Sequence, residues 1–293
     1  MRVILHTGVH CTDEDRLLKC LLRNKGEFRS RGIAVPGPGT YRNLLVSAAN
    51  ALGQARPSEE AREVLLDAML DEDMMNLDRL ILSHDHFFSV PKLMLAGGQY
   101  YRRAEDRLEA MTRLFEGDRI ELFMALRNPA TLLPTAFRDS PVTDVDEFLH
   151  GVDPMHLRWS ELIARIRDRL PDVPITLWCN EDSPLIWAQI VREMAGLPEG
   201  QKIIGGFTLL SEIMSREGMT RFRAYLKKHP GISEVQKRKV MIAFLDKFAI
   251  DDLIEEELDL PGWTEAHVDM LTELYEEDVY EIGQMDGVRV IAP

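Results

Sequence analysis

Residues 1–15 read MRVILHTGVHCTDED, and this stretch decides the fold. Residues 3–5 form a short apolar run with two β-branched side chains, which predicts a buried strand. Gly8 then permits a tight turn. Thr12 is a suitable N-cap, and acidic residues and leucines at helical spacing follow it, which predicts a helix. The stretch therefore predicts a strand, a glycine turn and a helix N-terminus, the junction at which α/β proteins bind anions.

The amino-acid composition limits the classes of protein to which the chain can belong. The chain has 293 residues, 45% of them hydrophobic, and its 35 Lys and Arg against 49 Asp and Glu give a net charge of −14. Nucleic-acid binding is disfavoured, because phosphates require a basic face. Cys11, Cys20 and Cys179 form no C-x-x-C pair, which indicates a reducing compartment. With no signal peptide before the first strand and no membrane-spanning apolar run, we expect a soluble, cytoplasmic protein.

Predicted strands and helices alternate over the first two thirds of the chain. Further strands are predicted at residues 77–83, 119–126 and 174–179, and residues 31–41, which are rich in glycine and proline, are predicted as a loop. Helices lie between the strands, so we expect a three-layer α/β fold with a central, mostly parallel sheet.

The last third has a different character. Helices are predicted at residues 207–228, 233–246 and 264–285, followed by an extended tail at 288–292. We therefore expect a single domain over residues 1–293. Its α/β core occupies residues 1–200, and residues 201–293 form a helical C-terminal portion that flanks the core.

Three predicted strands end in polar residues, at the edge where parallel sheets bind ligands. These residues are His6, Gly8, His10, Cys11 and Thr12 after the first strand, Ser83, His84, Asp85 and His86 after the second, and Arg127 after the third. Thr135 lies two helical turns beyond Arg127, so both side chains can share an anion, since the guanidinium fork matches phosphate oxygens. Alternatively, Arg127 pairs with an acid and Thr135 is an ordinary helical hydroxyl.

Three of these segments resemble the P-loop-like sulfotransferases, particularly bacterial members. LHTGVHCT at residues 5–12 is similar to the family's loop for the 5′-phosphosulfate, and LILSHDHF at 80–87 is similar to its second strand. LFMALRNPATLLPTAF at 122–137 is similar to its 3′-phosphate site, and residues 274–293 are similar to its closing segment. The resemblance implies a P-loop NTPase-like fold that transfers a sulfuryl group from 3′-phosphoadenosine 5′-phosphosulfate to a hydroxyl acceptor.

The resemblance also implies roles for single residues. Arg127 and Thr135 would hold the 3′-phosphate of the donor. The residues that would contact its 5′-phosphate are Gly8, Val9, His10 and Thr12, together with Cys11 at the position of the family's lysine. Losing that lysine removes a charge-assisted bond worth roughly 1.5–3 kcal/mol. Arg16 is a candidate to reach back and replace it.

The same loop departs further from the family. Asp13, Glu14 and Asp15 stand where the family has Gly-Thr-Thr, and their charges repel a phosphate. The sequence also lacks G-x-x-x-x-G-K-[ST] and G-x-G-x-x-G. A non-catalytic relative that keeps the fold and binds a partner, or no nucleotide, is therefore an open alternative.

Transfer would need a base near the acceptor hydroxyl. The candidates are His10, His84, Asp85 and His86, since histidine titrates near neutral pH and carboxylates can be tuned upward. They can equally cap strand ends and bond to backbone. The reaction would be an in-line displacement with no metal requirement.

A third class is a metal-dependent hydrolase that uses His84, Asp85 and His86 beside the histidines of the first loop. Imidazoles and carboxylates are ligands for zinc and iron, although H-E-x-x-H is absent. The sequence leaves open the acceptor, which can be a carbohydrate, a lipid or a small alcohol, and the oligomeric state.

Overall fold

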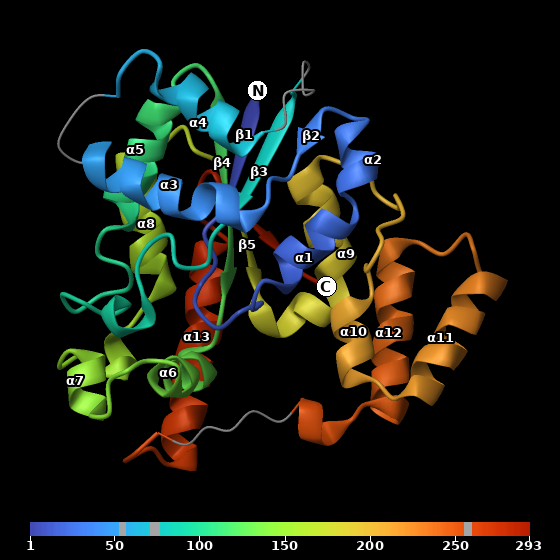
Figure 1. The fold of residues 1–293 in the computed structure, drawn as a ribbon. Helices are drawn as coiled ribbons and strands as arrows, with labels where there is room; N and C mark the ends of the chain where they lie inside the picture. Colours follow the sequence, from blue (N-terminus) through green and yellow to red (C-terminus); the bar gives the residue numbers. More distant parts are fainter. Residues whose placement is uncertain (53–56, 71–76, 255–259) are drawn as a thin grey trace.

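The computed structural model of the chain describes residues 1–52, 57–70, 77–254 and 260–293. Its centre is a six-stranded sheet of order β2-β3-β1-β4-β5-β6, in which every described pairing is parallel (Figure 1). The strands are β1 (Arg2–His6), β2 (Ile33–Ala34), β3 (Arg79–Ser83), β4 (Arg119–Leu126), β5 (Ile175–Cys179) and β6 (Val288–Ile291). Helices cover both faces of the sheet, so the predicted three-layer α/β fold is confirmed.

Two groups of helices make the outer layers. One face of the sheet packs against α3 (Pro38–Leu52), α4 (Ala61–Met69), α5 (Ala104–Leu114), α6 (Pro129–Arg138), α7 (Val145–Leu149), α8 (Trp159–Arg169) and α13 (Glu265–Ile282). The other face packs against α1 (Arg16–Arg23), α2 (Lys25–Arg29) and α9 (Ser183–Ala195). Val3 and Leu5 point to the first core and Ile4 to the second, because successive side chains of a strand alternate between its faces.

The sheet has a switch in direction at β1. From β1 the chain runs outward to β2, returns to β3, and then crosses to β4 on the opposite side of β1. The loop after β1 leads to α1 on one face, whereas the loops after β3 and β4 lead to α5 and α6 on the other. Loops that diverge in this way open a crevice beyond the carboxyl ends of the strands, where such sheets bind ligands.

The helical C-terminal portion divides into two parts (Figure 1). α10 (Thr208–Ile213), α11 (Arg216–Lys228) and α12 (Glu234–Phe248) build a small core of their own around Phe222 and Met241, and they contact α9. α13 instead packs on α6 and α8, and β6 pairs with β5. Residues 201–293 therefore leave the sheet and then return to it.

Several predicted boundaries are wrong. α1 begins at Arg16, and the Thr12 hydroxyl donates to the Val9 carbonyl at 2.7 Å instead of capping a helix. The predicted loop at 31–41 contains β2 and the start of α3, and the predicted extended tail is β6. The predicted helix at 207–228 is two helices, because Ser215 caps α11 through the Gly218 amide at 3.2 Å.

Short 3₁₀ turns join several of these elements. They are η1 (Pro91–Leu93), η2 (Pro154–His156), η3 (Asn180–Asp182) and η4 (Asp251–Leu253). Of the helices that the structure describes, none has both the length and the hydropathy that crossing a bilayer requires.

Candidate functional site

The β1 loop (residues 7–15) and Arg127 face each other at the carboxyl end of the sheet. The Arg127 guanidinium donates from Nη1 to the Cys11 carbonyl and from Nε to the Thr131 hydroxyl at 3.0 Å. Its Nη2 donates to the Thr135 hydroxyl at 3.3 Å. The structure thus brings Arg127 and Thr135 together, but Arg127 is only 6% exposed and its guanidinium is bound to groups of the protein.

The N-terminus of α1 already holds a carboxyl group of the protein. Asp13 is 8% exposed, and its Oδ2 accepts the Leu17 amide at 2.9 Å. The Asp13 carbonyl accepts the Arg16 amide at 2.8 Å. A phosphate at this helix N-terminus would need the same two amides, which already have acceptors. Burial raises the pKa of Asp13 above its usual value.

A cavity of about 240 Å³, here called the loop cavity, lies beside the β1 loop. Four carboxylates are among the described residues that line it, and no Lys or Arg is; the four are Asp13, Glu14, Asp85 and Asp139. Burial, and next the Asp139 carboxylate, raise the pKa of the Cys11 thiol to about 12. The Cys11 thiol is therefore neutral, and it lies beside carboxylates that repel an anion.

Arg16 is engaged by two carboxylates. Its guanidinium pairs with Glu14 and with Glu212 on α10, each at 3.0 Å. The Val9 side chain is buried in the core, and the Val9 carbonyl accepts the Thr12 hydroxyl. The roles predicted for these three residues at a 5′-phosphate stay predictions.

The β1 loop also touches the β3 loop (residues 84–90). Gly8 has a φ of +67°, and a Cβ there would lie 2.8 Å from the Asp85 Cα. His6 Nδ1 lies 2.9 Å from the Ser83 hydroxyl. His6 Nε2 and Thr7 Oγ1 are buried and have no hydrogen-bond partner among the residues that the structure describes, and neither residue lines the loop cavity.

His10 joins the two loops through both ring nitrogens. Its Nε2 lies 2.9 Å from the Ser89 carbonyl, which can only accept, so we assign the proton to Nε2. Its Nδ1 then accepts from the Tyr101 hydroxyl at 2.9 Å. Burial, followed by the neighbouring His86, lowers the pKa of His10 to about 4. The ring is neutral and fully engaged, so the geometry does not offer His10 as a general base.

Asp85 lies between positively charged and titratable groups. Its carboxylate is 3.8 Å from His84 Nδ1, 3.7 Å from His86 Nε2 and 4.0 Å from Arg42 Nη1. Burial opposes ionisation of Asp85, but His84, His86 and Arg42 outweigh it and lower the pKa well below the usual value. An ionised carboxylate held in this way is a weak base. His86 is the most exposed of the four predicted catalytic residues.

The described residues contain no ligand set for the metal-dependent hydrolase that the sequence left open. Among the described residues, no group of three or more His, Cys, Asp or Glu has the geometry to hold a metal ion. The two nitrogens of His10 are engaged, and His84 and His86 flank Asp85 instead of converging with it on one point.

A second cavity, of about 460 Å³, lies between α3, the β3 loop and α5, and we call it the arginine pocket. His84 and His86 line it together with Arg102, Arg103 and Arg107. Sequence reasoning missed these arginines, because residues 100–115 are typical of a charged surface helix. The signal that was present is the spacing of arginines in RRAEDR at residues 102–107.

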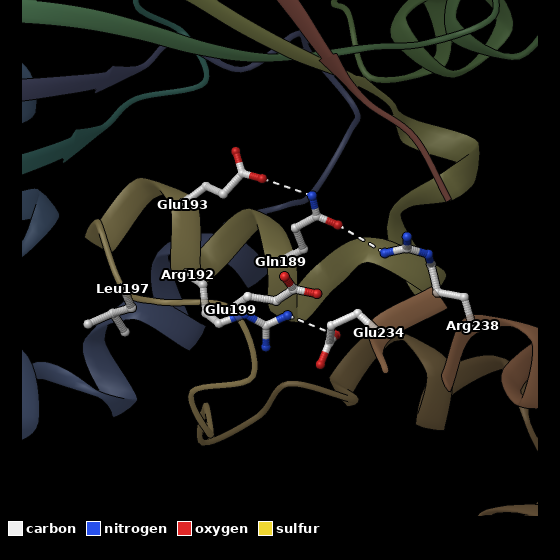
Figure 2. Close-up of a pocket in the computed structure, with 7 residues that line it drawn as sticks. All are labelled: Gln189, Arg192, Glu193, Leu197, Glu199, Glu234 and Arg238. Carbon is white, nitrogen blue, oxygen red and sulfur yellow. Dashed lines mark hydrogen bonds and ion pairs between the residues drawn. The ribbon is translucent and has the colours of Figure 1, made fainter. Parts of the chain in front are cut away.

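A third cavity, of about 290 Å³, lies where α12 meets α9 (Figure 2). The buried Arg192 donates to Glu234 at 2.9 Å, and Arg238 donates to the Gln189 carbonyl oxygen at 3.1 Å. The Gln189 amide in turn donates to Glu193 at 2.8 Å. These groups bind one another across the two helices, so we assign the network a structural role in holding α12 on α9.

Comparison of the chain with protein-family models, with curated proteins and with solved structures finds no match. The assignment of a function therefore depends on the chemistry of these cavities.

Proposed function

We propose that the chain is a non-catalytic relative of the P-loop-like sulfotransferases, a binding protein whose nucleotide loop is occupied by its own side chains. The observation that carries the proposal is the Asp13 carboxylate, which accepts the Leu17 amide at the N-terminus of α1. A donor phosphate would have to displace a carboxylate that is already hydrogen-bonded there. The free amides of a helix N-terminus bind anions, and here a side chain of the protein already accepts one of them.

Two further features support the proposal. Arg127, which would hold the 3′-phosphate, donates instead to the Cys11 carbonyl and to two threonine hydroxyls. The loop cavity beside it is lined by four carboxylates. Each charge-assisted bond that the family's lysine would make is worth roughly 1.5–3 kcal/mol. The loop therefore lacks attraction for the sulfonucleotide and adds repulsion.

A second candidate function is sulfuryl transfer from 3′-phosphoadenosine 5′-phosphosulfate to a hydroxyl acceptor. The observation that favours it is the pairing of Arg127 with Thr135 at 3.3 Å, the arrangement that the resemblance implies for the 3′-phosphate. The donor would then have to take Arg127 from the Cys11 carbonyl. His86, which lines the loop cavity, is the candidate base with the most exposed ring.

Calorimetry with 3′,5′-bisphosphoadenosine separates the two functions. We expect no binding to the unaltered chain below about 1 mM, which corresponds to about −4 kcal/mol. A dissociation constant below about 10 µM would overturn the proposal and favour the transferase. The variant Asp13→Asn, which keeps the shape of the side chain and removes its charge, should bind the nucleotide more tightly than the unaltered chain.

A further inference from the structure

The arginine pocket has the dimensions of a site for a small organic molecule. Its volume is about 460 Å³, against about 240 Å³ for the loop cavity. Ligand pockets generally measure about 300–1,000 Å³, with apolar walls and a few polar groups that fix orientation. The pocket opens between Val46 on α3 and the segment that leads into α5.

The charge of this pocket is opposite to that of the protein. Three arginines line it and no carboxylate is among its described lining, although the chain has a net charge of −14. The side chains of Arg102 and Arg103 are exposed and make no hydrogen bond or ion pair with a described residue. Two acids of α5 are engaged elsewhere, since Glu105 pairs with Arg165 and Glu109 with Arg169.

Two donor atoms of the pocket's lining residues, the Ser89 hydroxyl and Arg107 Nε, are shielded from solvent and have no hydrogen-bond partner among the described residues. Arg107 is fixed by a bond from Nη1 to the Phe87 carbonyl. Burial and the nearby Arg103 lower the pKa of Arg107 from its ordinary value. An anion in the pocket would relieve this crowding of positive charge.

The remaining wall is apolar. Phe88 is buried beneath it, while Val90 and Leu93 are 42% and 46% exposed. Val46 and Ala96 complete the apolar lining. A ligand with an apolar body would remove this surface from water while its anionic group reached the arginines.

We propose that the arginine pocket binds a small amphipathic anion, which is a carboxylate, a sulfate ester or a phosphate monoester on a short apolar body. The inference deepens the proposed function, and rests on it, because it names the ligand class of a binding protein. The exposed guanidinium groups of Arg102 and Arg103 would hold the anionic oxygens, and Val46, Val90 and Leu93 would cover the apolar body.

Calorimetry with four probes of equal chain length tests the proposal. The probes are octanoate, octyl sulfate, octyl phosphate and uncharged octanol, each used below its aggregation concentration. We expect at least one anion to bind with a dissociation constant of about 10–100 µM, and octanol to bind at least about tenfold more weakly. The three anions distinguish the head group. Equal affinity for octanol and the anions, or no binding at about 1 mM, would overturn the proposal.

Matched variants locate the site. Arg102→Gln and Arg103→Gln should each weaken binding of the best anion about tenfold. Arg223→Gln on α11 is the control, because it removes an exposed arginine far from the pocket in the chain and should leave the affinity unchanged. Unchanged affinity in both Arg102→Gln and Arg103→Gln would refute the assignment.

The outcome is separable from that of the proposed function. Binding of 3′,5′-bisphosphoadenosine to the unaltered chain would refute the proposed function, whatever the octyl probes do. Failure of the octyl probes, with no binding of bisphosphoadenosine, would refute only the ligand class.

Discussion

The loop cavity and the arginine pocket share His86 in their linings, yet the charges around the two cavities are opposite in sign. In the loop, the Asp13 carboxylate is bound by an amide of the protein and the Arg127 guanidinium by a carbonyl and two hydroxyls. In the pocket, Arg102 and Arg103 have no described partner. Charged groups with hydrogen-bond partners inside the protein stabilise the fold. Charged groups beside a cavity that have no described partner instead indicate where a ligand can bind.

Substitution of Arg127 should have the largest effect on stability. Arg127→Ala would leave the Cys11 carbonyl without this donor and would remove a buried side chain between β4 and the β1 loop. We expect it to lower the free energy of unfolding by about 3–5 kcal/mol, measured by urea denaturation.

Arg103→Ala is the control for that measurement. Its side chain is exposed and has no described partner, so its removal should change the free energy of unfolding by less than about 0.5 kcal/mol. Equal losses in the two variants would mean that the two regions do not differ in the way described.

The next largest effect should be a dependence of the free energy of unfolding on pH that is caused by His10. Its pKa of about 4 in the folded state lies below the ordinary 6.5, so the unfolded chain binds more protons between these values. The stabilisation is therefore complete above about pH 6.5 and is lost as the pH falls towards 4. The loss amounts to about 3 kcal/mol, measured as the difference between the unaltered chain and His10→Asn in urea denaturation at each pH.

His156→Asn controls for the general effect of acid. The His156 side chain is 81% exposed, so this variant should follow the unaltered chain at every pH. A His10→Asn variant with the same pH dependence as the unaltered chain would contradict the assignment of a buried, neutral ring.

The smallest of the three effects concerns the contact between the two loops. Gly8→Ala places a Cβ 2.8 Å from the Asp85 Cα at a φ of +67°. Gly117→Ala has a φ of +87° and nothing within 4 Å, so it reports the backbone strain alone. We expect Gly8→Ala to cost about 1–3 kcal/mol more than Gly117→Ala in thermal unfolding. Equal costs would show that the loops have room to separate.

Local pattern was sufficient to predict the bounds of one long central strand. The strand at 119–126 has the predicted bounds, because the apolar side chains of residues 122–126 are all buried and give it a clear signature. β2 was missed since its two residues are a strand only through their pairing with β3. The same holds for β6, which is extended because it pairs with β5, far earlier in the chain.

Only those features of the site that follow from the spacing of residues along a helix could be predicted. Arg127 and Thr135 are eight positions apart in the sequence, which corresponds to about two helical turns, and the structure does place both side chains together. The acids of the β1 loop were predicted to begin a helix, but Glu14 and Asp15 have φ values of +48° and +62°, which delays α1. That turn decides whether the Asp13 side chain faces solvent or the amides of α1. The turn does not follow from the spacing of apolar residues in the sequence.

The position of β6 has a consequence for how the chain is made. One side of β5 pairs with β4, and its other side pairs with β6, which follows only after α9–α13. While the ribosome synthesises these helices, the apolar strand ITLWC of β5 has an unpaired edge that can join strands of other nascent chains. Synthesis of residues 288–291 closes that edge, so a chain that stopped before them would leave it open to aggregation.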